Sequence, residues 1–157
     1  MKTFGLLSAL ALVLTMNVIG GEHKHEHKAP HHGTLVVFGE EFAHIELVLD
    51  KKTGKLTVYV LDGEAEKAVR IKQDEIELKI NKIEKKSADV ALKLKGQANV
   101  LTGEKEGDTS EFTAQANELK DVKRFEASVG AITIKGKEFK NTKFKFPEGN
   151  EHHGHDH

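Results

Sequence analysis

The chain has 157 residues, with 24 Lys and Arg against 25 Asp and Glu, and a formal net charge of −1 at pH 7. This balance gives no reason to expect nucleic acid as a partner, because that class of protein needs a basic face. The absence of cysteine excludes disulfides, iron–sulfur clusters and thiolate zinc sites.

Residues 1–20 have the pattern of a signal peptide. Lys2 supplies the positive start, an apolar run follows from Phe4 to Met16, and Val18 and Gly20 are small residues suited to the −3 and −1 positions of a cleavage site. The run is too short for a permanent membrane span. We therefore expect cleavage after Gly20, with Gly21 as the second choice, a periplasmic or secreted product and no membrane span after cleavage. An uncleaved anchor is the alternative.

Two polar tails are expected to flank one folded domain. Residues 21–30 carry charge and histidine with hardly any apolar side chain, and residues 148–157 are similar. Such segments cannot bury enough apolar surface to fold by themselves, so we expect both tails to be disordered. The domain between them is predicted to span residues 31–147.

The first half of the domain shows strand alternation in chain order. A short β-rich run occupies residues 34–38. Apolar and polar residues then alternate over 42–50 and 55–61, with a turn between them, which predicts a hairpin. The polar connection 62–67 follows, and residues 68–72 are a candidate brief strand.

The second half continues in the same way. Residues 76–81 and 90–94 predict a second hairpin, 108–116 an edge-like strand, and 118–123 one helical turn. Residues 125–134 and 139–146 predict a final hairpin whose alternation slips near Gly130 and Asn141, which indicates bulges. About eight short strands favour an all-β fold, an antiparallel β-sandwich of immunoglobulin-like form, with an open barrel as the alternative.

Histidine is concentrated at the two ends of the chain. Five of the ten histidines lie between Gly21 and Gly33, and they are His23, His25, His27, His31 and His32. Four more lie in the last six residues, and they are His152, His153, His155 and His157. Neutral imidazole is the commonest protein ligand for zinc, copper and nickel, so both runs predict transition-metal binding. The alternative is a merely soluble tail.

Cleavage after Gly20 would create a further ligand set. The mature chain would begin Gly21-Glu22-His23, so a free amine, two amide nitrogens and the imidazole of residue three would form a square-planar group. That geometry suits Cu(II) or Ni(II).

His44 is the one histidine outside the tails. It lies in the predicted strand 42–50, with Glu46 two residues on and on the same face, opposite the apolar Ala43, Ile45 and Leu47. Residues so spaced lie about 7 Å apart, close enough to bind one ion or to pair. His44 is therefore either solvent-facing or hydrogen-bonded, or it joins His31 or His32 in a metal site.

The sequence between residues 29 and 70 also resembles a pattern in bacterial periplasmic proteins of heavy-metal efflux systems. The matching residues are Pro30-His31-His32-Gly33, then Phe42-Ala43-His44-Ile45-Glu46-Leu47-Val48, then Tyr59-Val60-Leu61-Asp62. In that pattern the first motif reads Pro-His-Gly-Gly, so His32 stands here where the first glycine would be. Such modules occur alone or beside membrane-fusion adaptor proteins of cation efflux pumps. The resemblance implies a role in handling copper, zinc, nickel or cobalt, with His31, His32, His44 and Glu46 as ligands.

These observations favour a binding protein over an enzyme, because no Ser/His/Asp order stands out and no helix or Lys-Ser/Thr follows Gly103 and Gly107 to form a phosphate loop. We expect it to buffer or deliver a transition-metal ion, copper, zinc, nickel or cobalt, in metal homeostasis or efflux. Protonation of imidazole competes with the ion, so binding should weaken below about pH 6. The alternative is a non-catalytic interaction module that docks an efflux adaptor or another envelope protein.

Overall fold

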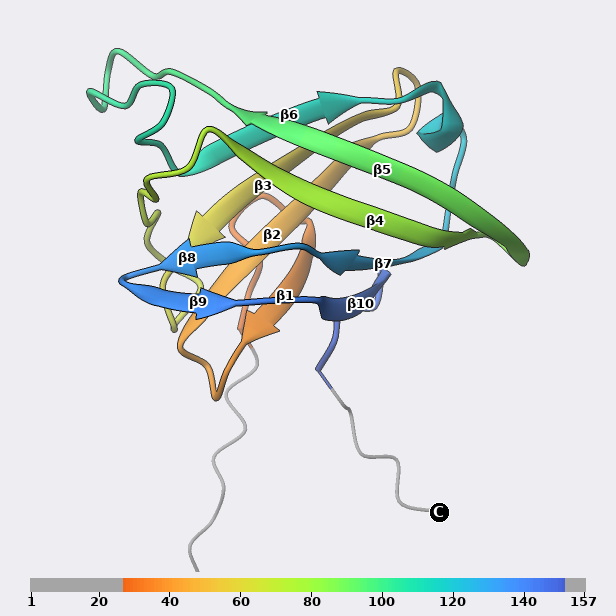
Figure 1. The fold of residues 1–157 in the computed structure, drawn as a ribbon, viewed down its shortest axis with the longest axis horizontal. Coiled ribbons are helices and arrows are strands. Elements are labelled where there is room, and N and C mark those ends of the chain that lie inside the picture. Colours follow the sequence, from red (N-terminus) through yellow and green to blue (C-terminus); the bar gives the residue numbers. More distant parts are fainter. Residues whose placement is uncertain (1–26, 152–157) are drawn as a thin grey trace, which may run out of the picture.

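The computed structural model describes residues 27–151, which form one curved antiparallel sheet and a small accessory hairpin (Figure 1). The strands are β1 (Thr34–Phe38), β2 (Ala43–Asp50), β3 (Lys55–Leu61), β4 (Glu75–Ile83), β5 (Lys86–Gly96), β6 (Glu111–Gln115), β7 (Phe125–Val129), β8 (Ile132–Ile134), β9 (Lys137–Phe139) and β10 (Thr142–Phe146). A single 3₁₀ turn, η1 (Asn117–Leu119), connects β6 to β7. The predicted all-β antiparallel fold is confirmed.

The main sheet has eight strands in the order β1-β2-β3-β6-β5-β4-β7-β10, and β8 pairs with β9 apart from it. The sheet curls until β1 and β10 approach each other, so it is nearly a barrel (Figure 1). Of the two predicted architectures, the open barrel is the one that this sheet resembles. Such curvature wraps one face of every strand around a single core.

That core is built from the alternation that the sequence shows. Its members are fully or almost fully buried aliphatic and aromatic side chains from all the main strands, among them Phe38, Leu47, Leu94, Phe112 and Phe125.

In the described part of the chain, no helix is long and apolar enough to cross a membrane.

The predicted hairpins are confirmed, but the predicted position of one strand in the sheet is wrong. β2 pairs with β3, and β4 with β5, as the alternation indicates. The strand expected at the sheet edge is β6, which lies between β3 and β5 in the middle of the sheet. Its partner β5 is the preceding strand, but its other partner, β3, lies far away in sequence, and alternation within a strand carries no information about such a neighbour. The last hairpin is interrupted at residues 130–131 and 140–141, where its alternation slips.

A polar side chain bridges the seam between the two ends of the sheet. Asn150 accepts a hydrogen bond from the Val37 backbone nitrogen at 2.7 Å and donates one to the Val37 carbonyl oxygen at 3.0 Å. The Thr34 hydroxyl donates to the Pro147 carbonyl at 3.1 Å nearby. Ordered contacts therefore extend past residue 147, where the predicted domain ends.

The loop between β5 and β6 is held by the Glu104 carboxylate. It accepts hydrogen bonds from the Ser110 nitrogen at 2.9 Å, the Ser110 hydroxyl at 2.6 Å and the Thr102 hydroxyl at 2.5 Å. Burial alone would raise the pKa of Glu104, but the hydrogen bonds from Ser110 and Thr102 outweigh it, and the pKa lies below its usual value. The ionised form is thus the one that the folded loop stabilises.

We therefore expect the loop to loosen in acid. A carboxyl whose pKa is lowered by folding contributes stability above its unfolded pKa, about 4.3 for Glu, and loses it as the pH falls through the lowered value. Amide hydrogen exchange of residues 99–110, corrected for intrinsic rates, should show less protection at pH 3 than at pH 6. Glu104→Gln should reproduce the loss at pH 6, whereas the exposed neighbour variant Glu106→Gln should not. Equal protection in both variants would contradict this role for Glu104.

Candidate metal site

Both faces of the first half of β2 are buried. Ile45 points into the core, while His44 and Glu46 lie on the opposite face and are also 0% exposed. Two irregular segments account for this cover, since residues 27–33 and 62–64 make the polar contacts of that face. A solvent-facing His44 was one of the alternatives that the sequence left open, and the burial of His44 excludes it.

The hydrogen bond of His44 determines which nitrogen of its neutral ring carries the hydrogen. Nδ1 lies 3.1 Å from the carbonyl oxygen of Asp62. A carbonyl can only accept, so Nδ1 carries the hydrogen, and in the neutral ring Nε2 carries the lone pair. That Nε2 is buried and has no hydrogen-bond partner.

His27 repeats this arrangement at the end of the described chain. Its Nδ1 lies 3.2 Å from the Glu64 carbonyl oxygen, its side chain is 5% exposed, and its Nε2 is likewise buried without a hydrogen-bond partner. The two rings are neighbours, with centroids 4.9 Å apart and planes at 61°. Two buried imidazoles thus lie side by side, and in its neutral form each has a lone pair that accepts no hydrogen bond from a described residue. His27 was predicted to lie in a disordered tail, and here its side chain is part of the folded protein.

Glu46 has a different role from the one the sequence indicated. One carboxylate oxygen accepts the backbone N–H groups of His31 and Gly33, both at 2.8 Å. The other lies 2.7 Å from Nδ1 of His31. A carboxylate with these three donors anchors the turn at residues 30–33 and is already satisfied, so it is a poor ion ligand as it stands.

His31 is oriented by Glu46 and by Tyr59, which lies opposite Glu46 on β3. The rings of His31 and Tyr59 stack with centroids 3.8 Å apart and planes at 14°. Burial, and then the charges of Glu111 and Glu46, raise the pKa of the Tyr59 hydroxyl. The His31 side chain remains 45% exposed, and Nδ1 is the ring nitrogen that the carboxylate holds. Carboxylate-bound histidine is common in metal sites, because the carboxylate fixes the ring and raises its basicity.

His32 is exposed and has φ 59°, the left-handed conformation that glycine adopts most readily. No described contact brings His32 to His44.

Taken together, the structure separates the predicted ligands into three groups. His44 joins His27, and Glu46 joins His31, whereas His32 stands alone. Six further predicted ligands, His23, His25, His152, His153, His155 and His157, lie outside the described residues, as do the signal peptide and the amine-based site. Within residues 27–151, no three His, Asp or Glu side chains are gathered so that they could hold an ion as they stand.

Sequence reasoning missed the groups that orient the two buried rings. These are the main-chain carbonyls of Asp62 and Glu64, in the connection after β3. A backbone carbonyl has no side-chain signature, so no residue type could have indicated them. The nearest anionic group, Glu41 Oε1 at 3.6 Å from His27 Nε2, was also missed, because the turn 39–42 reads as ordinary polar sequence.

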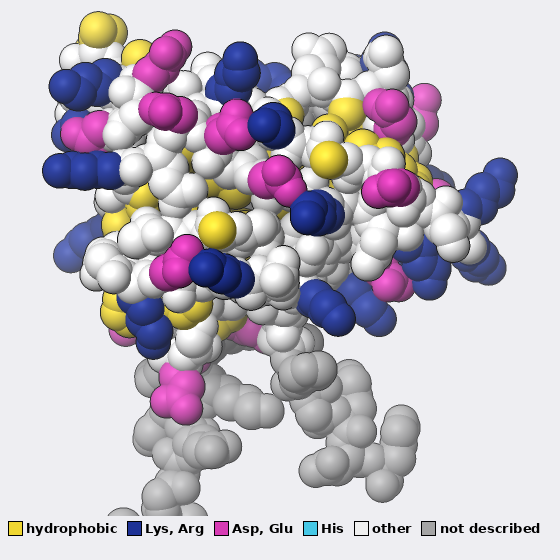
Figure 2. Space-filling model, in the orientation of Figure 1, with side chains coloured by type: hydrophobic (Ala, Val, Ile, Leu, Met, Phe, Trp, Pro, Cys, Tyr) yellow, Lys and Arg dark blue, Asp and Glu magenta, His cyan; other side chains and the backbone are white. Residues whose placement is uncertain are grey.

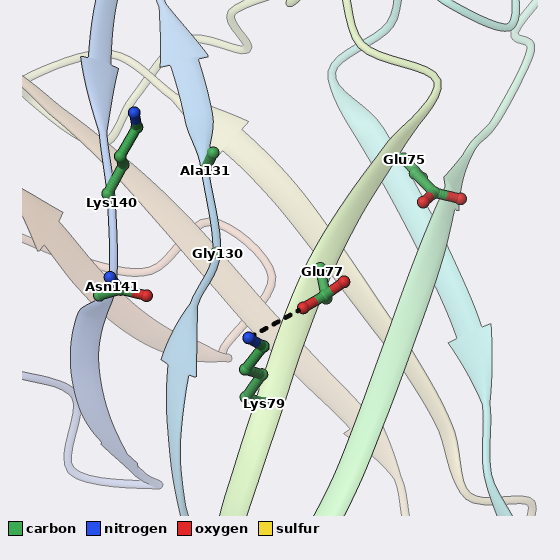
Figure 3. A pocket seen from close by; sticks show the side chains of 7 residues that line it. All are labelled: Glu75, Glu77, Lys79, Gly130, Ala131, Lys140 and Asn141. Atoms are coloured by element: carbon green, nitrogen blue, oxygen red, sulfur yellow. Dashed lines mark ion pairs between the residues drawn. The ribbon is translucent and has the colours of Figure 1, made fainter.

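A depression on another part of the surface is a weaker candidate for a binding site. It lies beside β4 and the two breaks in the last hairpin, and Glu75, Glu77, Lys79, Gly130, Ala131, Lys140 and Asn141 line it (Figure 3). Its carboxylates are already paired with lysines, Glu77 with Lys79 at 3.6 Å and Glu75 with Lys93 at 3.0 Å. Figure 2 shows basic and acidic side chains interspersed over this face of the molecule, without a large area of one sign.

No family model, curated protein or solved structure matches the chain.

Proposed function

We propose that the protein binds a transition-metal ion at the His27–His44 pair. The observation that carries the proposal is that both rings have a buried Nε2 with no hydrogen-bond partner. Leaving a buried polar atom unsatisfied costs about 1–3 kcal/mol, so two adjacent cases need an explanation. An ion that takes both lone pairs removes both penalties. The Nδ1–H bonds to main-chain carbonyls are the outer-shell bonds that metal-binding histidines commonly make.

The physiological role follows from the pair together with the sequence of the tails. Tail histidines supply exchangeable ligands, and the buried pair holds an ion more selectively within the folded domain. With a cleaved signal peptide, the protein would act in the periplasm or as a secreted protein. There it would buffer copper, zinc, nickel or cobalt, or deliver the ion to an efflux system or its adaptor protein.

The test separates the pair from the tails. The full-length chain is prepared with its six tail histidines at positions 23, 25, 152, 153, 155 and 157 changed to serine, a form that we call the tail-serine protein. Zn²⁺ titration by calorimetry should still show one site. Zn²⁺ at 100 times its Kd should raise the free energy of unfolding by about 2.7 kcal/mol.

His44→Leu in the tail-serine protein is the decisive variant. It fills the same space with an apolar side chain and removes an unsatisfied buried atom, so the free energy of unfolding without metal should not fall by more than about 1 kcal/mol. Zn²⁺ should no longer bind or stabilise it, while His32→Ala should bind as before. A tail-serine protein that binds no ion, or a His44→Leu variant that binds Zn²⁺ normally, would contradict the proposal.

One observation favours a second candidate, an interaction module. Val100 and Leu101, at the tip of the loop between β5 and β6, are 94% and 95% exposed. Adjacent aliphatic side chains so exposed are typical of a contact surface for another protein. Changing both to serine should leave Zn²⁺ binding unaltered. If that change alone abolished metal tolerance of the cells that make the protein, docking would be the primary function.

A further inference from the structure

We infer that Glu41 is the third ligand of the His27–His44 site, and that the site therefore selects a divalent ion over Cu(I). This inference rests on the function proposed above and adds one residue and an ion class to it. Three observations carry it: the spacing of the two rings, the distance from Glu41 to His27, and the availability of the Glu41 carboxylate.

The spacing of the two rings matches a bent arrangement around one ion. With metal–nitrogen bonds of about 2.0–2.1 Å, two imidazoles at a tetrahedral angle have ring centroids about 5 Å apart, and two in a linear arrangement about 6 Å apart. The observed separation for His27 and His44 is 4.9 Å. The pair thus leaves room for further ligands on one side of the ion, which a linear two-coordinate Cu(I) site would not need.

Glu41 lies where such a ligand belongs. Its Oε1 is 3.6 Å from the unpartnered Nε2 of His27. Two donor atoms that share a tetrahedral ion at about 2.0–2.1 Å are about 3.4 Å apart, so the separation needs only a small change. The Glu41 backbone lies close against Gly63, where a Cβ would collide with the Glu41 carbonyl oxygen. The turn that carries Glu41 is therefore packed against the connection 62–64 that orients both rings.

The Glu41 carboxylate is also free to turn. Its side chain is 52% exposed, and within residues 27–151 it makes no hydrogen bond. Two other carboxylates of this region are engaged: Glu46 by the turn at residues 30–33, and Asp62 by the backbone nitrogens of Glu66 and Lys67. A rotation of the Glu41 side chain toward His44 would complete two nitrogens and one oxygen around an ion. A fourth position would stay open to water or to an incoming ligand.

This ligand set favours zinc or cobalt(II) over Cu(I). Carboxylate oxygen is a hard donor that suits divalent ions, whereas Cu(I) prefers thiolate or thioether sulfur. The chain has no cysteine, and its two methionines lie at positions 1 and 16.

The experiment compares Glu41→Gln with Glu40→Gln in the tail-serine protein. Both variants remove one negative charge from the same turn, so only the ligand role differs between them. Glu41→Gln should weaken Zn²⁺ binding at least about 10-fold and reduce the visible absorption of a tetrahedral Co²⁺ complex. Glu40→Gln should change neither, and Cu(I) affinity, measured by competition with a chromogenic chelator, should be the same in both variants.

The outcomes keep this inference apart from the proposed function. If Zn²⁺ binding needs His44 but is equal in the two glutamine variants, Glu41 is not a ligand and the proposed function stands. If Glu41→Gln weakens Cu(I) binding as much as Zn²⁺ binding, the inferred selectivity is wrong. If the tail-serine protein binds no ion at all, the proposed function itself falls.

Discussion

Glu46→Ala is expected to destabilise the protein by about 3 kcal/mol or more, because it deletes the buried acceptor of three hydrogen bonds. The backbone nitrogens of His31 and Gly33 and the His31 ring would lose their common partner at once. Chemical denaturation monitored by far-UV circular dichroism measures the loss. Glu46→Gln keeps one carbonyl acceptor and should fall between the wild type and the alanine variant.

The same variant has a spectroscopic signature. The chain has one tyrosine and no tryptophan, so the tyrosine band of its near-UV circular dichroism, which lies apart from the bands of its eight phenylalanines, reports the environment of Tyr59. Loss of the stacked His31 ring should reduce that signal even in buffer, before unfolding begins. Glu66→Ala, at an exposed position after β3, is the control and should stay within about 0.5 kcal/mol of the wild type. A Glu46→Ala protein as stable as this control would show that the turn at residues 30–33 is held by other contacts.

Gly33→Ala should cost about 2–4 kcal/mol through overpacking against β2. A Cβ at Gly33 would collide with the Leu47 carbonyl oxygen and would lie 2.8 Å from Glu46 Cγ and 2.9 Å from Val48 Cγ2. A backbone oxygen within a sheet cannot move aside without breaking the ladder, so the turn would have to lift from the strand. Thermal unfolding, followed with and without Zn²⁺, measures both the stability and the effect on ion binding.

Gly136→Ala is the matched control for this effect. Gly136 has φ 78°, and a Cβ there would meet nothing within 4 Å. Its substitution therefore isolates the conformational cost of a left-handed residue, about 1 kcal/mol. If the two alanine variants were equally stable, the close approach of Gly33 to β2 would not be a constraint on the fold.

The sequence predicted those parts of the fold that are decided locally. The β2–β3 hairpin was predicted from alternation on both sides of a turn that ends at Gly54, which has φ 72°. The breaks in the last hairpin were predicted from shifts in that alternation, and Asn141 there has φ 54°. The position of β6 was not predicted, because its neighbour β3 is far from it in the chain and is chosen by long-range packing.

The candidate site was predicted only in part, for a related reason. Alternation placed His44 and Glu46 together on one face of β2, and that is where they lie. It could not show that irregular segments cover this face, because covering depends on main-chain carbonyls and on a glycine that lets the chain approach. Nor could it separate His27 from its neighbours in the histidine run, since only its position against His44 distinguishes it. The polar character of that run predicted a tail, but the His27 ring contacts Glu64 and His44 in the folded domain.

The seam of the sheet has a consequence for the order in which the protein folds. Its hydrogen bonds join residues 34–37 to 147–150, which are 113 positions apart in sequence. Bringing such distant segments together carries a loop-closure cost that local hairpins do not have. While the chain is being synthesised, β1 can pair with β2, but its other edge stays open until Asn150 has emerged. During that interval the outer edge of β1 is available for pairing with any other extended chain. The side-chain amide of Asn150 closes that edge when it bonds the Val37 backbone.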